Sequence, residues 1–125
     1  MKQTKQKRIE HSEQAKVVAR VRAFYPGVII AAIPNGAARS ASERLNLYGE
    51  GLLSGMPDLC VLRASGGFHG LFVEMKTLEG RMSEAQRDIQ RRLIKEGYVA
   101  VTCRSADEAW ATIQEYLDHG DRKVG

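Results

Sequence analysis

Short apolar runs alternate with amphipathic stretches along most of this chain. Four runs have the length and apolar content of strands, at residues 28–33, 58–63, 71–76 and 98–103. Three stretches combine apolar residues at helical spacing with capping signals, at residues 12–24, 83–96 and 105–117. Residues 41–48 are a candidate for one more short helix.

This order of elements predicts an α/β fold in which helices flank a mixed sheet of about four strands. The glycine-containing connection at residues 64–70 is short enough for a hairpin. The following strand–helix–strand step predicts a parallel crossover. With 125 residues, the chain is expected to form a single domain, residues 1–125. Within it, residues 1–11 are expected to be a flexible basic arm and residues 119–125 a frayed tail.

Composition narrows the class of protein only a little. The net charge of +4 and the pI of about 9.3 favour a polyanionic partner, although such a charge also serves solubility alone. Cys60 and Cys103 lie in apolar runs, which predicts reduced core thiols. No apolar run approaches the ~20 residues of a membrane span, and the basic N-terminus lacks an apolar signal core. We therefore expect no membrane association and a cytoplasmic location.

Two carboxylates and one ammonium group are predicted to meet at one end of the sheet. Asp58 opens the second strand, and Glu74 and Lys76 lie two residues apart on the third, so their side chains share a face. An unpaired charge in a buried position costs on the order of several kcal/mol in folding free energy. Such a cluster therefore indicates a metal site or a catalytic site. Mg²⁺ needs only one or two carboxylates together with a substrate phosphate. The backbone carbonyl of Met75 is a candidate third oxygen ligand, and Lys76 is suited to orient water or neutralise charge at phosphorus.

Helix positions add further candidates for this site. Gln86 shares an inward face with Ile89 and Leu93, so its amide can reach a water or a phosphate oxygen. Glu13 lies at the edge of the apolar stripe of the first helix. It either faces inward or is a first-turn glutamate favoured by the helix dipole, and spacing alone slightly favours the dipole reading.

Several arginines are candidates for contacts with phosphate. Arg39 and Arg44 are either phosphate contacts or solvated loop residues. Arg81 and Arg87 belong to the most basic part of the chain, which a solvated helix surface explains unless the active site lies nearby. The chain lacks zinc-ligand spacing and the GxxxxGK[ST], GxGxxG and GxSxG motifs, so no nucleotide cofactor is expected.

The pattern P-D, then about fifteen residues, then E-x-K across a hairpin resembles the PD-(D/E)XK nuclease superfamily. Further motifs agree: IPNG at residues 33–36, SGMPD at 54–58, FVEMK at 72–76, LEGRMSEAQ at 78–86 and CRS at 103–105. Together they are similar to the VRR-NUC (virus-type replication-repair nuclease) branch over residues 12–117. The resemblance implies a restriction-endonuclease-like core of the order α-β-(α)-β-β-α-β-α.

The resemblance also implies roles for single residues. Glu13, Asp58 and Glu74 would be ligands of Mg²⁺ or Mn²⁺, Lys76 the catalytic lysine and Gln86 the helix glutamine beside the site. Asn35 and Arg39 would lie in a substrate-side loop. Nucleic-acid contacts are accordingly predicted for Asn35, Arg39, Arg44, Arg81 and Arg87.

Stand-alone members of this branch are associated with homodimers that cut four-way DNA junctions. The expected function is therefore that of a Holliday junction resolvase, a homodimeric endonuclease on branched DNA in a bacterial or phage-infected cytoplasm. A nuclease of flap, single-stranded or duplex DNA is one alternative. A non-catalytic DNA-binding module on the same fold is another, and it predicts salt-sensitive binding without hydrolysis.

Overall fold

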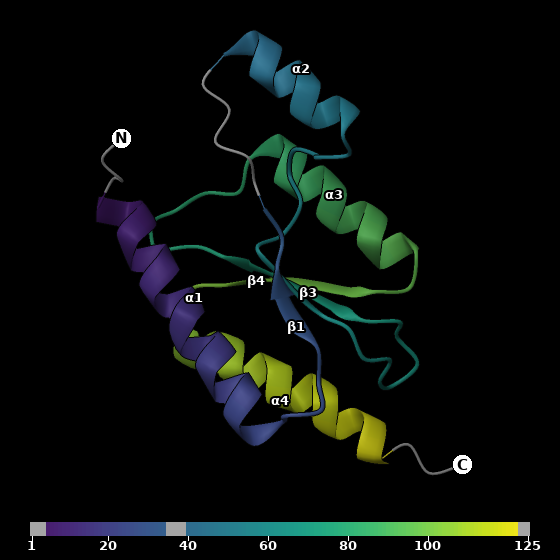
Figure 1. Ribbon diagram of the computed structural model, residues 1–125. Helices are drawn as coiled ribbons and strands as arrows, with labels where there is room; N and C mark the ends of the chain where they lie inside the picture. The colour runs from purple at the N-terminus through teal and green to yellow at the C-terminus, as the bar shows by residue number, and fades with distance from the viewer. Residues whose placement is uncertain (1–4, 35–39, 123–125) are drawn as a thin grey trace.

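The computed structural model describes residues 5–34 and 40–122 and contains the predicted order of elements (Figure 1). The helices are α1 (Lys5–Phe24), α2 (Ala41–Gly49), α3 (Glu84–Lys95) and α4 (Ala106–Arg122). The strands are β1 (Ile30–Ala32), β2 (Leu59–Val61), β3 (Leu71–Met75) and β4 (Val99–Cys103). The short helix at residues 41–48 is thus confirmed. The strands β1 and β2 are each shorter than predicted.

The four strands form one mixed sheet in the order β1-β2-β3-β4. The pairs β1/β2 and β2/β3 are antiparallel, as the hairpin predicts, and β3/β4 is parallel, as the crossover predicts. The helices α1 and α4 pack against each other and against β3, whereas α3 packs against β4 on the other side of the sheet (Figure 1). This is the predicted sandwich of helices on a four-stranded mixed sheet.

The core between the sheet and the α1/α4 layer is almost wholly apolar. Its fully buried side chains include Val17 and Val21 of α1, Val73 of β3 and Ile113 of α4. Cys60 and Cys103 are free and buried, as predicted. Among the described residues, Glu74 is the one charged side chain that is buried. The fold therefore holds a single buried charged group on a strand whose other buried positions, Leu71, Val73 and Met75, are apolar.

Both ends of the chain are more helical than expected. The helix α1 begins at Lys5 rather than at Ser12, so the basic arm predicted for residues 1–11 is helical from Lys5 onward. A tertiary hydrogen bond supports these two extra turns, because Gln6 Nε2 donates to Thr77 Oγ1 at 2.7 Å. The helix α4 continues to Arg122, past the predicted start of the frayed tail at residue 119. Within the described ranges, no helix is long and apolar enough to cross a membrane.

The helix α2 stands apart from the sheet, at the top of Figure 1. Ser40 caps it by accepting a hydrogen bond from the Glu43 amide at 3.1 Å, which satisfies one of the free N–H groups of the first turn. No residue of α2 is buried. Local capping and propensity thus form this helix without a core contact.

The loop before β2 approaches α3 at Gly55. Gly55 has φ +93°, and a Cβ there would lie 2.5 Å from the Ala85 carbonyl oxygen and 3.0 Å from the Gln86 amide nitrogen. Only glycine allows both the left-handed backbone and this contact. Gly55 therefore fixes the distance between the loop that leads to Asp58 and the helix turn that carries Gln86.

We expect Gly55→Ala to lower the free energy of unfolding by about 2–4 kcal/mol, because backbone strain and a backbone clash add together. Gly67→Ala is the matched control, since Gly67 has φ +92° with open space around the added Cβ. It should cost only the strain, about 1 kcal/mol. Urea denaturation measures both. Equal losses in the two variants would show that the contact with α3 does not matter.

Candidate active site

The register of the hairpin sets Asp58 next to Glu74. Leu59 of β2 pairs with Val73 of β3 in the antiparallel ladder. The next positions in this register are Asp58, just before β2, and Glu74, inside β3. The Asp58 carbonyl also accepts a hydrogen bond from the Ile33 amide at 2.8 Å, which holds this residue to the end of β1. The two carboxylates therefore lie side by side at one end of the sheet, as the motif predicts.

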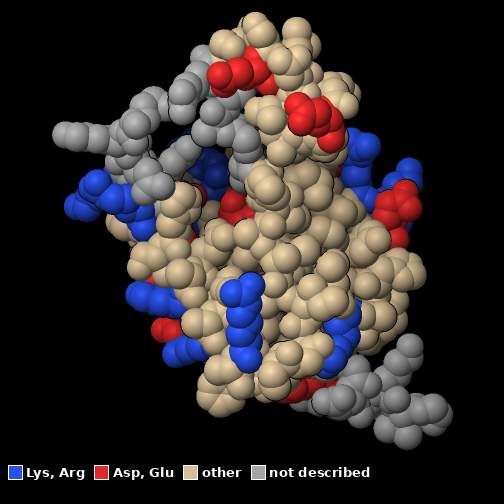
Figure 2. Space-filling model, in the orientation of Figure 1, with Lys and Arg blue, Asp and Glu red and all other residues tan. Residues whose placement is uncertain are grey.

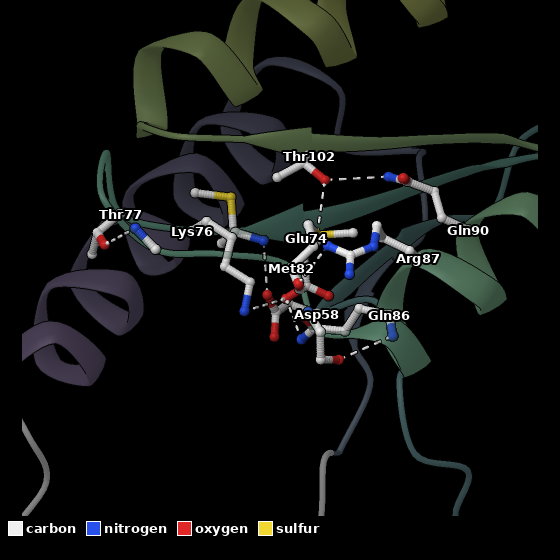
Figure 3. A network of polar contacts seen from close by, with 12 residues as sticks. Asp58, Glu74, Lys76, Thr77, Met82, Gln86, Arg87, Gln90 and Thr102 are labelled. Atoms are coloured by element: carbon white, nitrogen blue, oxygen red, sulfur yellow. Dashed lines mark hydrogen bonds and ion pairs between the residues drawn. The ribbon is translucent and has the colours of Figure 1, made fainter.

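Backbone and side-chain contacts orient this carboxylate pair (Figure 3). The Met75 amide donates to Asp58 Oδ2 at 2.7 Å. Lys76 Nζ lies 4.0 Å from Glu74 Oε2, and both side chains are largely buried, with 14% and 4% exposed. In Figure 3 the side chains of Asp58, Glu74 and Lys76 point toward one another. The period-two prediction that Glu74 and Lys76 share a face is confirmed.

Gln86 links the site to α3 through its two amide atoms. Its Oε1 accepts from the Ser83 amide at 2.8 Å, and Ser83 Oγ accepts from the Gln86 amide at 3.1 Å, which is the predicted capping box. With Oε1 engaged there, Nε2 is directed at Glu74 Oε2, 3.4 Å away. The cap therefore orients the amide so that its donor faces the carboxylates.

The electrostatics of the pair are unfavourable when both acids are ionised. The pKa of Glu74 is raised to about 9, mainly by burial and then by the hydrogen bond and negative charge of Asp58, while the positive charge of Lys76 acts in the opposite direction. Glu74 Oε1 is buried and has no hydrogen-bond partner among the described residues. A buried oxygen of this kind needs a proton or a cation. Without a bound cation, a proton on Glu74 meets that need.

The donor set fits a hard divalent cation. Carboxylate oxygens are ligands that Mg²⁺ and Mn²⁺ prefer, and one or two of them suffice where a substrate phosphate completes the shell. Within residues 5–34 and 40–122, no three side chains of the types His, Cys, Asp and Glu gather tightly enough for a metal ion. Asp58 and Glu74 are thus the acids that the strands bring together, and the Met75 carbonyl remains a predicted ligand.

The structure does not bring Glu13 to this pair. Glu13 Oε1 accepts from the Ala106 amide at 3.0 Å, and Oε2 pairs with Lys16 Nζ at 2.8 Å. The hydrogen bond from Lys16, followed by that from the Ala106 amide, lowers the pKa of Glu13. This carboxylate therefore serves the first turn of α4, where the helix dipole favours negative charge.

Glu10, one turn before Glu13 on α1, is the acid that the sequence analysis missed. Its negative charge contributes to the raised pKa of Glu74, as the smallest of the causes and in the same direction as Asp58. Glu10 is half-buried. Residues three apart lie on one helix face, so the spacing that pointed to Glu13 also fits Glu10. The signal was hidden because the helix was predicted to begin only at Ser12.

The predicted nucleic-acid contacts fall into two groups. Arg44 lines a cavity of about 730 Å³ between α2 and the first turn of α3, together with Ser83 and Gln86. Arg81 and Arg87 are exposed, and Arg87 Nη1 donates to the Met82 carbonyl at 2.9 Å. Asn35 and Arg39 lie outside the described residues. On the face in Figure 2, the described Lys and Arg side chains are spread out rather than gathered in one patch.

Two carboxylates and a lysine at the end of a mixed sheet, across a hairpin, define the active-site class of PD-(D/E)XK nucleases. The family model described as the VRR-NUC domain matches residues 3–107. Among solved structures, one titled "VRR_NUC domain protein" is 27% identical, covers 89% of both chains and has a TM-score of 0.75. The comparison with curated proteins found no match.

This chain belongs to the VRR-NUC domain family, and its sheet and flanking helices are the restriction-endonuclease-like core of that family. Family membership makes it a nuclease of the PD-(D/E)XK type, a hydrolase with DNA as its substrate. The resemblance to the VRR-NUC family, inferred from the sequence motifs, is thereby confirmed.

Without metal, we expect the free energy of unfolding to fall as the pH rises from about 5 to about 9, by at most ~1.4 kcal/mol per pH unit. Glu74 keeps its proton to about pH 9 in the folded state but ionises near its ordinary pKa of 4.5 when unfolded. Ionisation therefore favours the unfolded chain across this window. Urea denaturation in EDTA at several pH values measures the slope.

Glu74→Gln should flatten this slope and be more stable than wild type at pH 8.5, because the amide cannot ionise. Glu79→Gln makes the same chemical change at an exposed loop position and should keep the wild-type slope. A Glu74→Gln variant that loses stability with pH as steeply as wild type would contradict this assignment of the buried charge.

Proposed function

We propose that this protein is a metal-dependent DNA endonuclease that hydrolyses phosphodiester bonds at Asp58, Glu74 and Lys76. The observation that supports this most strongly is the buried Glu74 carboxylate, which lies between Asp58 and Lys76 with one oxygen unsatisfied. A purely structural role does not account for it, because an apolar residue at this position of β3 would be more stable.

Each side chain has a separate role in this reaction. Asp58 and Glu74 would hold Mg²⁺ or Mn²⁺, with the Met75 carbonyl as a further oxygen ligand. When bound, such an ion would supply Lewis-acid chemistry toward the phosphodiester and a water of lowered pKa. Lys76 Nζ orients the attacking water and offsets negative charge as it develops on the phosphate oxygens. Gln86 Nε2 donates one N–H to Glu74, and in this proposal its second N–H holds a water or a phosphate oxygen.

Glu10 takes the part in this proposal that the resemblance implied for Glu13. The negative charge of Glu10 acts on Glu74, and Glu10 comes from α1, which packs against β1 and β3, whereas Gln86 comes from α3, which packs against β4. A bound cation or its waters would draw it closer, since a third acid offsets more of the metal charge. Glu13 remains with the N-terminus of α4.

We further propose that the substrate is a four-way DNA junction and that the active form is a homodimer. One chain carries one Asp58–Glu74 pair, so two symmetric cuts require two chains related by a two-fold axis. The cavity beside Gln86 supports a strand path, because Arg44 lines it together with Gln86, whose amide contacts Glu74. Arg81 and Arg87 flank the same first turn of α3 and are proposed to contact phosphates, as are Asn35 and Arg39.

We expect wild-type protein to cut a four-way junction in Mg²⁺, and Lys76→Ala and Asp58→Asn each to lose about 100-fold or more in rate. Lys95→Ala removes the same charge from an exposed position of α3 and should retain cleavage. Gel analysis of labelled junctions measures the rates. Equal cutting by Lys76→Ala and wild type would refute the assigned chemistry.

The same assay should include flap, single-stranded and duplex DNA at equal concentration. We expect the junction to be cut at least about tenfold faster than the others, since only it offers two equivalent sites to a dimer. Faster cutting of flaps would support the proposed nuclease activity but reject the four-way junction as the preferred substrate. Salt-sensitive binding without any cleavage would instead support a non-catalytic DNA-binding module.

We expect Glu10→Gln to lower the rate about tenfold at subsaturating Mg²⁺ and to be largely restored at high Mg²⁺, because it weakens ion binding. Glu13→Gln should mainly lower the free energy of unfolding, by about 0.5–1 kcal/mol, through the loss of its helix contact. Mg²⁺ titrations and urea denaturation separate the two effects. A lower rate at subsaturating Mg²⁺ in Glu13→Gln, with only a loss of stability in Glu10→Gln, would instead make Glu13 the third acid of the site.

A further inference from the structure

The turn between β3 and α3 is held from outside by a residue far away in the sequence. This turn begins with Thr77, directly after Lys76, and the Gly80 amide closes it by donating to the Thr77 carbonyl at 3.1 Å. Arg104 Nη1 donates to that same carbonyl at 2.9 Å and also to the Gly80 carbonyl. One guanidinium nitrogen thus bridges both ends of the turn.

Arg104 is itself well fixed. Its amide donates to Glu108 Oε2 at 3.0 Å, within the capping contacts of α4. The carbonyl of Cys103, the residue before Arg104, accepts a hydrogen bond from the Lys76 amide at 3.0 Å. The β4–α4 junction therefore holds the chain at Lys76 and again at Thr77 and Gly80. Gln6 adds a contact from α1 to the Thr77 hydroxyl.

The turn has little room to relax. Gly80 is buried, and a Cβ there would lie 2.9 Å from Gln6 Nε2 and 3.1 Å from Thr77 Oγ1. Within the described residues, no carboxylate forms an ion pair with Arg104. One terminal nitrogen of its guanidinium therefore serves two neutral carbonyls. A lysine ammonium also carries several N–H donors, but it lacks the planar group that fixes their directions, so it would replace Arg104 only in part.

We propose that Arg104 is a positioning residue for DNA cleavage: its guanidinium fixes the turn that holds Lys76 at one end and leads to Gln86 at the other. This inference rests on the proposed function. Both groups act on Glu74 across gaps of 4.0 Å and 3.4 Å, so a small shift of the turn changes both contacts. Misplacement of a catalytic group by about 1 Å can cost on the order of 100-fold in rate.

The test compares Arg104→Gln and Arg104→Lys with the control Arg63→Gln. Arg63 also donates to a backbone carbonyl, that of Gly27 at 3.5 Å, but lies beyond the other end of β2. Cleavage of junction DNA is measured in saturating Mg²⁺, with the folded fraction determined by circular dichroism at the assay temperature. Hydrogen exchange of residues 77–82 is measured on the same proteins without DNA.

We expect Arg104→Gln to lower kcat about 10- to 100-fold per folded molecule, with KM changed less than about threefold. Arg104→Lys should recover part of this loss, and Arg63→Gln should match wild type. Exchange in residues 77–82 should speed up in Arg104→Gln alone. If Arg104→Gln does not fold, the same measurements are compared between Arg104→Lys and Arg63→Lys.

Three results would overturn the proposal. The first is a kcat of Arg104→Gln within about twofold of that of Arg63→Gln. The second is a loss of activity no larger than the fraction of unfolded protein. The third is a rise in KM without a fall in kcat, as the loss of a phosphate contact would give. If wild type cuts no DNA, the proposed function fails instead. Hydrogen exchange then still decides whether Arg104 holds the turn, and unchanged exchange would reject it.

Discussion

The burial of Glu74 beside Asp58 is the constraint on which the rest of this structure depends. Two carboxylates at one end of a sheet repel each other, and burial adds a desolvation cost that the apolar neighbours of β3 cannot offset. The unsatisfied Oε1 of Glu74 marks where that cost is concentrated. The fold maintains this unfavourable pair through the ladder β1-β2-β3-β4, which fixes the register of both strands.

The surrounding elements each place one group against that pair. The capping box of α3 directs the Gln86 amide at Glu74, and Gly55 allows the loop before Asp58 to touch the same helix turn. The helix α1 brings the charge of Glu10 within reach of Glu74. Arg104, from the β4–α4 junction, holds the turn after Lys76. Every layer of the sandwich thus contributes to the site, although the catalytic motif itself spans only β2 and β3.

Local patterns were sufficient to predict the centre of this site from the sequence. Period two placed Glu74 and Lys76 on one face, and the pattern Ser83–Gln86 placed a cap at the start of α3. Both rules depend on residues close in the chain, where geometry is fixed by the backbone.

The periphery of the site could not be predicted in the same way. The early start of α1 comes with a contact between Gln6 and Thr77, which are 71 residues apart, so no local pattern distinguishes Glu10 from Glu13. The hold of Arg104 on Thr77 likewise joins segments that only the folded sheet brings together. Sequence patterns thus predict the chemistry at the centre, whereas only tertiary contacts show that Glu13 is engaged at α4 and that the charge of Glu10 acts on Glu74.

The central claim is that the carboxylate pair exchanges a proton for a divalent cation. Isothermal titration of Mn²⁺ at pH 7.5, in buffers of different ionisation enthalpy, counts the protons released for each ion bound. The account predicts that wild type releases about one proton and that Glu74→Gln releases none. Binding by wild type without proton release, or equal release by Glu74→Gln, would contradict it.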